Sequence, residues 1–165
     1  VRDGCVAKLA QKKNDLNVCK LIKDTKTLGF CQESIAEATN NSAICGQISD
    51  GYWSDNCYFN LAINHNQTQH CFNISRTEQK QTCFKTIALS TNNHIWCAFV
   101  GEKNKIPCYI KIAPVRKDPR ICLFIQESMN RGLCNFRVAK AANKSDMCRH
   151  ISVPQIRKDC EEYFK

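Results

Sequence analysis

The spacing of the cysteines constrains this chain more than any other feature of its sequence. They stand at positions 5, 19, 31, 45, 57, 71, 83, 97, 108, 122, 134, 148 and 160, so their separations alternate between 14 and 12, with one of 11 after Cys97. The alternation defines a 26-residue repeat that contains two cysteines. Because a fixed period of this length is the signature of repeat architectures, the sequence predicts an array of small, similar units.

Other residues recur in phase with the cysteines. Six of the cysteines, at 5, 31, 57, 83, 108 and 134, open the pattern Cys-x-x-x-apolar-Ala, as in Cys31, Ile35 and Ala36, which places three side chains on one helical face. The other cysteines open Cys-x-x-apolar, as in Cys45 and Ile48. Each repeat is therefore expected to hold two amphipathic helices. We call the first helix A, with Cys19, Cys45, Cys71, Cys97, Cys122 or Cys148, and the second helix B, with the cysteine that follows.

Asparagine marks the joints between repeats. It follows the alanine of helix B by four residues at positions 14, 40, 66, 92 and 143, with Lys117 the one departure, and it tolerates the left-handed conformation that ends helices. Ser42, Thr68 and Ser145 stand where an N-cap of helix A is expected. We predict an all-α fold, a right-handed solenoid of about six and a half αα-hairpins. It comprises a lone helix over 1–14 and repeats over 15–40, 41–66, 67–92, 93–117, 118–143 and 144–165.

Disulfides are expected to stabilise the hairpins. Each helix should span about 8 to 11 residues, too few to be stable alone. In an antiparallel hairpin the linked cysteines must lie at similar heights, and the mismatch is about 3 Å for pairs 12 apart but about 6 Å for pairs 14 apart. The geometry favours Cys19–Cys31, Cys45–Cys57, Cys71–Cys83, Cys97–Cys108, Cys122–Cys134 and Cys148–Cys160, with the other pairing left open. The favoured scheme leaves Cys5 as a free or interchain thiol.

Persistent disulfides indicate an oxidising compartment, so we expect a secreted or cell-surface protein. No cysteines or histidines have the short spacing of a zinc site, and no metal or other cofactor is expected. The longest apolar run, Ile95–Val100, is too short to cross a bilayer. Because the sequence begins with Val1 rather than Met, we expect a processed or excerpted product.

Four Asn-x-Ser/Thr sequons are candidate glycan acceptors, at Asn40, Asn66, Asn73 and Asn143. Three of them lie in the turn between hairpins, where Asn and Ser/Thr are also explained by helix capping. Capping and glycosylation are compatible, because an exposed turn of a secreted protein is accessible. Asn73 falls inside helix A beside the inward-facing Ile74 and is a candidate only if that helix has an exposed flank.

The chain carries 24 Lys+Arg against 15 Asp+Glu, a formal charge of +9. A continuous basic stripe would suit an acidic surface polymer or a nucleic acid, but the cations are spread between core positions, as on a solvated helix face. The pair Tyr52-Trp53 is a candidate contact for a partner, or else covers a hairpin end. No catalytic motif with defined spacing occurs, so we do not expect an enzyme.

The two elements of one repeat read SAICGQI over residues 42–48 and SDNCYFNLAI over residues 54–63. This pair resembles a cysteine-punctuated repeat of uncharacterised secreted and surface proteins of microbes, archaea among them. The resemblance covers essentially the whole chain and depends on the 26-residue phase. It implies an extracellular location and says little about activity.

These features favour an extracellular structural protein whose copies associate end to end, as a filament or surface appendage. The expectation rests on the absence of an evident capping repeat, on the opening half-module and on the unpaired cysteine. The alternative is a monomeric binding module that uses the solenoid face to hold a protein, a glycan or a nucleic acid.

Overall fold

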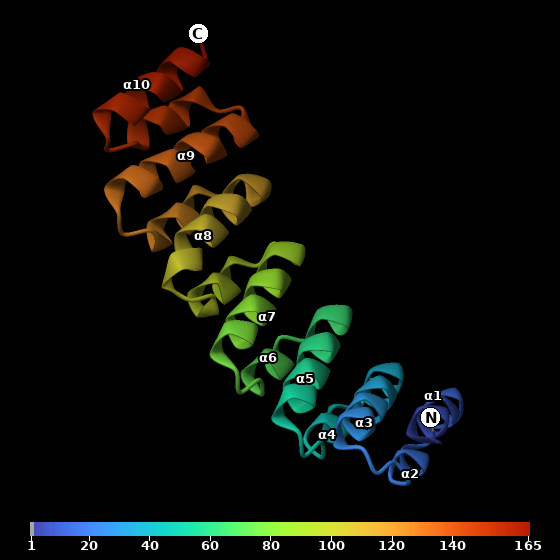
Figure 1. The fold of residues 1–165 in the computed structure, drawn as a ribbon. Coiled ribbons are helices and arrows are strands. Elements are labelled where there is room, and N and C mark those ends of the chain that lie inside the picture. The colour runs from blue at the N-terminus through green and yellow to red at the C-terminus, as the bar shows by residue number, and fades with distance from the viewer. Residues whose placement is uncertain (1) are drawn as a thin grey trace. The chain divides into compact units, whose positions relative to one another are not determined.

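The structure of this chain is a computed structural model that describes residues 2–165. Over these residues it is built from helices and turns, with no β-strand. Two compact units are formed, one up to Cys83 and one over Phe84–Lys165. In both units a short helical segment alternates with a long α-helix (Figure 1). The predicted all-α fold of repeated helix pairs is thus confirmed.

The first unit contains α1 (Arg2–Lys13), α2 (Leu16–Cys19), α3 (Thr25–Thr39), α4 (Ser42–Cys45), α5 (Gly51–His65), α6 (Gln69–Phe72) and the beginning of α7 (Thr77–Ser90). The second unit contains the end of α7, the 3₁₀ helix η1 (His94–Phe99), α8 (Glu102–Arg116), η2 (Pro119–Phe124), α9 (Ser128–Ala142), η3 (Ser145–His150) and α10 (Pro154–Tyr163).

The two helices of a hairpin are unequal, and the expectation that both would be short and similar in length is wrong. Helix A is a single α-turn of 4 residues, as in α4, or 6 residues of 3₁₀ helix, as in η2. Helix B reaches 15 residues in α3, α5, α8 and α9. The cause is visible at Asp24 and Asp50, which cap helix B only five places after the helix-A cysteine and leave no room for a longer helix A.

The left-handed residues fall where the sequence predicted them. Asn14, Asn40, Asn66, Asn92 and Asn143 have φ of 49° to 53°, and Lys117 shares the geometry with φ 52°. The caps of helix A, in contrast, lie one residue earlier than expected. Asn41 accepts from the N–H of Ala43 at 3.1 Å, and the same capping bond is made by Asp15, Asn93 and Asp118. Ser42 and Ser145 are instead the first residues of their helices. Thr68 stands at its N-cap position without a capping side-chain bond.

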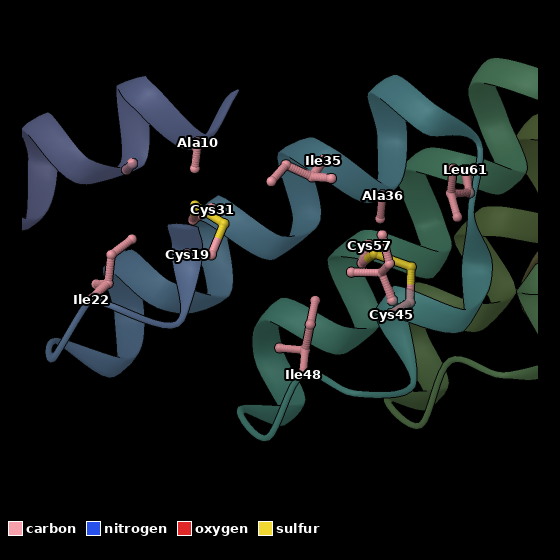
Figure 2. Packing of buried hydrophobic residues seen from close by; sticks show 12 residues of the cluster. Ala10, Cys19, Ile22, Cys31, Ile35, Ala36, Cys45, Ile48, Cys57 and Leu61 are labelled. Atoms are coloured by element: carbon pink, nitrogen blue, oxygen red, sulfur yellow. A yellow bond between two sulfur atoms is a disulfide. The ribbon is translucent and has the colours of Figure 1, made fainter. Parts of the chain in front are cut away.

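The core repeats the same positions in the hairpins that precede Cys148, whereas the last hairpin has Phe164 and Lys165 at the places of the apolar-Ala pair. This core consists of both cysteines, the apolar residue three places after the helix-A cysteine, and the apolar-Ala pair of helix B (Figure 2). In α3 these are Cys31, Ile35 and Ala36, each no more than 1% exposed. The small alanine lets neighbouring helices approach closely, which is the role that its recurrence predicted.

Six disulfides join helix A to helix B, with Cα–Cα distances of 5.5 to 5.9 Å, inside the ordinary range. They link Cys19–Cys31, Cys45–Cys57, Cys71–Cys83, Cys97–Cys108, Cys122–Cys134 and Cys148–Cys160. This is the pairing that the hairpin geometry favoured. Cys5 on α1 is free and exposed.

The hairpin that is one residue short closes on a glycine. Gly101 has φ 69° and ψ 151°, a backbone conformation that side chains with a Cβ rarely adopt, and it takes the place of the longer loop found in the other hairpins. The spacing between Cys97 and Cys108 is therefore one residue shorter because this loop is shorter. The disulfide keeps a Cα–Cα distance of 5.7 Å.

Lys117 should be a weak point of the second unit, because lysine adopts the left-handed conformation less readily than asparagine. We expect Lys117→Asn to raise the free energy of unfolding by about 1 kcal/mol. The reverse change at an equivalent joint, Asn143→Lys, should lower it by a similar amount. Denaturant unfolding of both variants measures the difference, and equal stabilities would show that the left-handed geometry does not limit these joints.

Gly29 allows a close approach between α3 and α5. A Cβ at this position would lie 2.6 Å from the ring carbons Cγ and Cδ1 of Trp53. Gly29→Ala is therefore expected to destabilise the chain by about 1 to 3 kcal/mol through overpacking. Gly4→Ala on α1, where nothing lies within 4 Å of the added Cβ, is the matched control and should be neutral or stabilising. Equal denaturation midpoints for the two variants would contradict the close packing.

Candidate functional site

Two hydrogen bonds, one turn apart, join α3 to α5. Oε1 of Glu33 on α3 accepts from Nδ2 of Asn60 on α5 at 2.7 Å, and Glu37 accepts from Asn64 one turn further on. The glutamates stand two and six places after the cysteine of their helix, and the asparagines three and seven places after theirs. At this junction α3 presents the second and sixth places after its cysteine to α5, and α5 presents the third and seventh places after its own to α3.

Single hydrogen bonds join other neighbouring B helices. Gln11 of α1, six places after its cysteine, donates to Ser34 of α3, three places after its own, at 3.0 Å. In the second unit Lys85, two places after its cysteine, donates to Asn104 of α8 at 3.0 Å. These two bonds do not keep the register of the α3–α5 contact: Gln11 and Ser34 stand six and three places after their cysteines, and Asn104 stands four places before Cys108.

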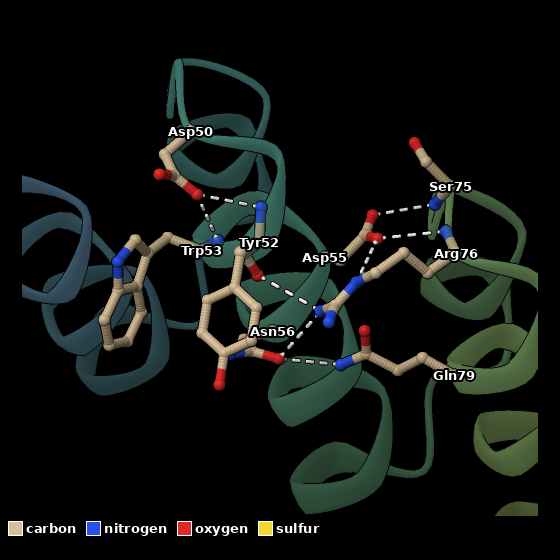
Figure 3. A network of polar contacts seen from close by, with 8 residues as sticks. All are labelled: Asp50, Tyr52, Trp53, Asp55, Asn56, Ser75, Arg76 and Gln79. Atoms are coloured by element: carbon tan, nitrogen blue, oxygen red, sulfur yellow. Dashed lines mark hydrogen bonds and ion pairs between the residues drawn. The ribbon is translucent and has the colours of Figure 1, made fainter. Parts of the chain in front are cut away.

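A buried aspartate fastens α5 to the loop before α7. Asp55 is 2% exposed and accepts from the N–H of Ser75 at 2.7 Å, and from the N–H and Nε of Arg76 at 3.0 Å each (Figure 3). Burial opposes the charge of this carboxylate, but the two backbone donors and the guanidinium outweigh it and lower the pKa of Asp55. Asp3 makes the equivalent bonds to the N–H groups of residues 23 and 24, at 3.1 and 2.9 Å.

The residue two places before the helix-B cysteine decides how a hairpin meets the next one. Asp3 and Asp55 stand there, and Gly29 and Gly132 occupy the same place in other repeats. The glycines leave space for bulky side chains of the following hairpin, namely Trp53 at Gly29 and Ile156 at Gly132. Sequence reasoning missed this position, although the alternation of Asp and Gly at 26-residue intervals over residues 3–55 would have shown it.

The helices α1 and α10 have exposed residues at the places that form the α3–α5 contact. On α1, Lys8 and Lys12 stand three and seven places after Cys5, the places that Asn60 and Asn64 hold on α5, and both lysines are exposed. On α10, the exposed Glu162 stands two places after its cysteine, the place of Glu33 on α3. Leu9 of α1 is 46% exposed although it holds a core position.

The aromatic pair predicted as a contact is divided between two roles. Trp53, in the first turn of α5, packs edge-on against Phe30 with ring centroids 5.7 Å apart and lies over Gly29. Its ring contacts thus include residues of α3, in the neighbouring repeat. Tyr52 is 55% exposed, with the guanidinium of Arg76 4.6 Å from its ring centroid. Tyr52 is therefore exposed on the surface of the first unit, whereas Trp53 packs against α3.

The four sequon asparagines are all exposed. Asn40, Asn66 and Asn143 are the left-handed C-caps of α3, α5 and α9. Asn73 follows the last residue of α6 as its C-cap, because helix A is shorter than the sequence suggested. All four lie in joints or turns rather than inside a helix, so the reason for setting Asn73 apart from the others is removed.

Across residues 2–165, no cluster of three or more His, Cys, Asp or Glu side chains is arranged to hold a metal ion. In the same stretch, none of the helices has the length and apolar character needed to span a membrane. His70, the one histidine at an apolar repeat position, is 8% exposed and stacks on Tyr58, and burial lowers its pKa. It is accounted for as a core residue of the first unit.

Comparison with known proteins adds no relative: no protein-family model, curated protein sequence or solved structure matches the chain. What the structure itself supports is the architecture, helix pairs joined by six regularly spaced disulfides.

Glu33 should make the first unit more stable in mild acid. Burial and the neighbouring charge of Glu37 raise its pKa to about 7 from 4.5, against the lowering effect of the bond from Asn60. The folded chain thus binds this proton more tightly than the unfolded chain does. Its free energy of unfolding should rise as the pH falls from about 7 to 4.5, below which both states are protonated.

The variant Glu33→Gln keeps an acceptor for Asn60 and removes the charge. We expect it to be more stable than the native chain at pH 8, by about 2 kcal/mol, and to lose this part of the pH dependence. The exposed Glu78→Gln is the control and should leave the profile unchanged. Denaturant midpoints measured at intervals from pH 4.5 to 8 test this, and parallel profiles for all three proteins would contradict it.

Proposed function

We propose that this chain is a non-enzymatic extracellular structural protein whose copies stack end to end through a contact like the one that joins α3 to α5. The observation that carries the proposal is the register of α1 and α10. On the exposed edge of α10, Glu162 holds the place of Glu33 on α3, and on the exposed edge of α1, Lys8 holds the place of Asn60 on α5.

The charges on these two edges are complementary. Inside the first unit the contact is a neutral-to-acidic pair, Asn60 with Glu33. Placing α10 of one copy against α1 of another in the same register sets Glu162 opposite Lys8. Glu162 lies 3.9 Å from Lys158 of its own helix, an exposed pair that is easily exchanged for the new one. An exposed ion pair contributes at most about 1 kcal/mol, so it specifies the register more than it supplies affinity.

Apolar surface on α1 supplies the affinity in this proposal. Leu9 is 46% exposed, whereas Ile35 and Leu61 at the equivalent core position are 1% exposed or less. Full burial of a leucine side chain stabilises by about 1.5 to 3 kcal/mol, so covering the exposed part of Leu9 is worth about half of that. A second copy stacked on α1 supports the association by burying this residue.

The six disulfides support an oxidising, extracellular setting for such an assembly. In that setting the exposed thiol of Cys5 is available for a covalent bond between chains. The exposed sequons at Asn40, Asn66, Asn73 and Asn143 are proposed as glycan acceptors that lie on joints and so leave the stacking edges free.

Sedimentation velocity of the 165-residue chain should show reversible association at micromolar concentration. Lys8→Glu and Glu162→Lys should each weaken it about tenfold at low salt, because each replaces an attraction with a repulsion. The double variant should recover most of the affinity. Lys103→Glu on α8, an exposed lysine away from both edges, is the matched control.

A Cys5→Ser variant separates stacking from covalent linkage, since the proposed contact needs no bond through this residue. Association that persists in Cys5→Ser and fails in the single charge variants supports the proposal. A chain that remains monomeric up to high micromolar concentration, with or without Cys5, would overturn it.

A further inference from the structure

We infer that a hollow beside Tyr52 and Trp53 binds a neutral saccharide ring, which gives the first unit a glycan-binding site in addition to the proposed stacking role. The hollow has a volume of about 310 Å³ and is lined by Lys26, Asp50, Tyr52 and Trp53. It lies between the beginning of α3, which carries Lys26, and the first turn of α5, which carries the two rings.

The two rings form an aromatic corner. Their centroids are 5.4 Å apart and their planes meet at 89°. A pyranose ring presents C–H groups on its faces and hydroxyl groups around its edge, and aromatic side chains contact such apolar faces well. Sites for small ligands commonly combine aromatic walls of this kind with a few polar groups that fix orientation.

Both rings are held before any ligand arrives. Trp53 is fixed by its packing over Gly29 and against Phe30. Tyr52 is held by Arg76, which lies over its ring and donates from Nη2 to its backbone carbonyl at 3.3 Å (Figure 3). Because the aromatic corner is already ordered, binding loses little side-chain entropy.

The polar groups suit hydroxyls. Asp50 caps α5 through Oδ1, which accepts from the N–H groups of Tyr52 at 2.9 Å and Trp53 at 3.2 Å. These bonds fix the carboxylate and leave Oδ2 to accept from a sugar hydroxyl. Lys26 is exposed on the other side of the hollow and is a donor.

The charges at the hollow favour a neutral ligand over a nucleic acid. One cation, Lys26, and one anion, Asp50, line it, so it adds nothing to the chain's excess of positive charge. A phosphate group placed here would meet the Asp50 carboxylate at short range and be repelled. A polyol meets a donor, an acceptor and two apolar ring faces, which is the chemistry of a saccharide.

The test uses three saccharides, cellotriose, mannotriose and chitotriose, each titrated into the ¹⁵N-labelled chain and followed by NMR. We expect at least one to shift the indole N–H of Trp53 and the amides of Lys26 and Tyr52. Tyr52→Ala should weaken that binding about tenfold, the effect of removing a central aromatic contact. Asp50→Asn keeps the cap through its carbonyl oxygen and should weaken binding severalfold.

Tyr163→Ala is the matched control, since Tyr163 is also 55% exposed and also has a cation over its ring, Lys140 at 4.2 Å. It should leave saccharide binding unchanged. The inference is overturned if none of the three saccharides shifts these resonances, if Tyr52→Ala binds as tightly as the native chain, or if a single-stranded oligonucleotide takes the site instead. Sedimentation velocity of Tyr52→Ala measures self-association separately from saccharide binding, so either proposal can fail without the other.

Discussion

The covalent bond between a one-turn helix and a long helix is the constraint on which this structure depends. A helix of 4 residues, such as α4, has no stability of its own in water, yet it supplies Ile44 and Cys45 to the core. The disulfide holds that turn against helix B by closing a loop between cysteines 12 positions apart, worth on the order of 3 kcal/mol in the chain-entropy model. Without the disulfide, the one-turn helix would no longer pack against the buried face of helix B.

Because the disulfides fix each hairpin internally, the outer edges of the B helices are free to specify how hairpins meet. At one junction Asp55 binds two backbone N–H groups of the next loop, and at another Gly29 admits the ring of Trp53. The first is a polar clamp and the second is close packing, yet both occur at the same repeat position. A constant core is therefore combined with junctions that differ, which favours one neighbour for each hairpin over the others.

The features that could be predicted from the sequence are those that depend on spacing within one repeat, namely the cysteine pairs, the core positions and the left-handed joints. The unequal helix lengths could not be predicted, because the sequence pattern did not identify Asp50 as the N-cap of α5. Since helix B begins at this cap, the residues available for helix A are few. The roles of Tyr52 and Trp53 could not be separated either, although the two are adjacent. Only Trp53 faces a glycine of the neighbouring repeat, and that depends on the contact between α3 and α5.

The same reasoning links the junctions to the proposed assembly. Leu9 holds a core position that is buried in α3 and α5, and it is 46% exposed on α1. Covering it requires a surface with the register of a B-helix edge, which the chain itself provides on α10. In the proposed assembly, copies that meet in the register of the α3–α5 contact need no separate interface. The use of one kind of contact inside the chain and between copies is the physical reason for proposing a structural role. In the proposed assembly the aromatic corner near Tyr52 lies away from the stacking edges.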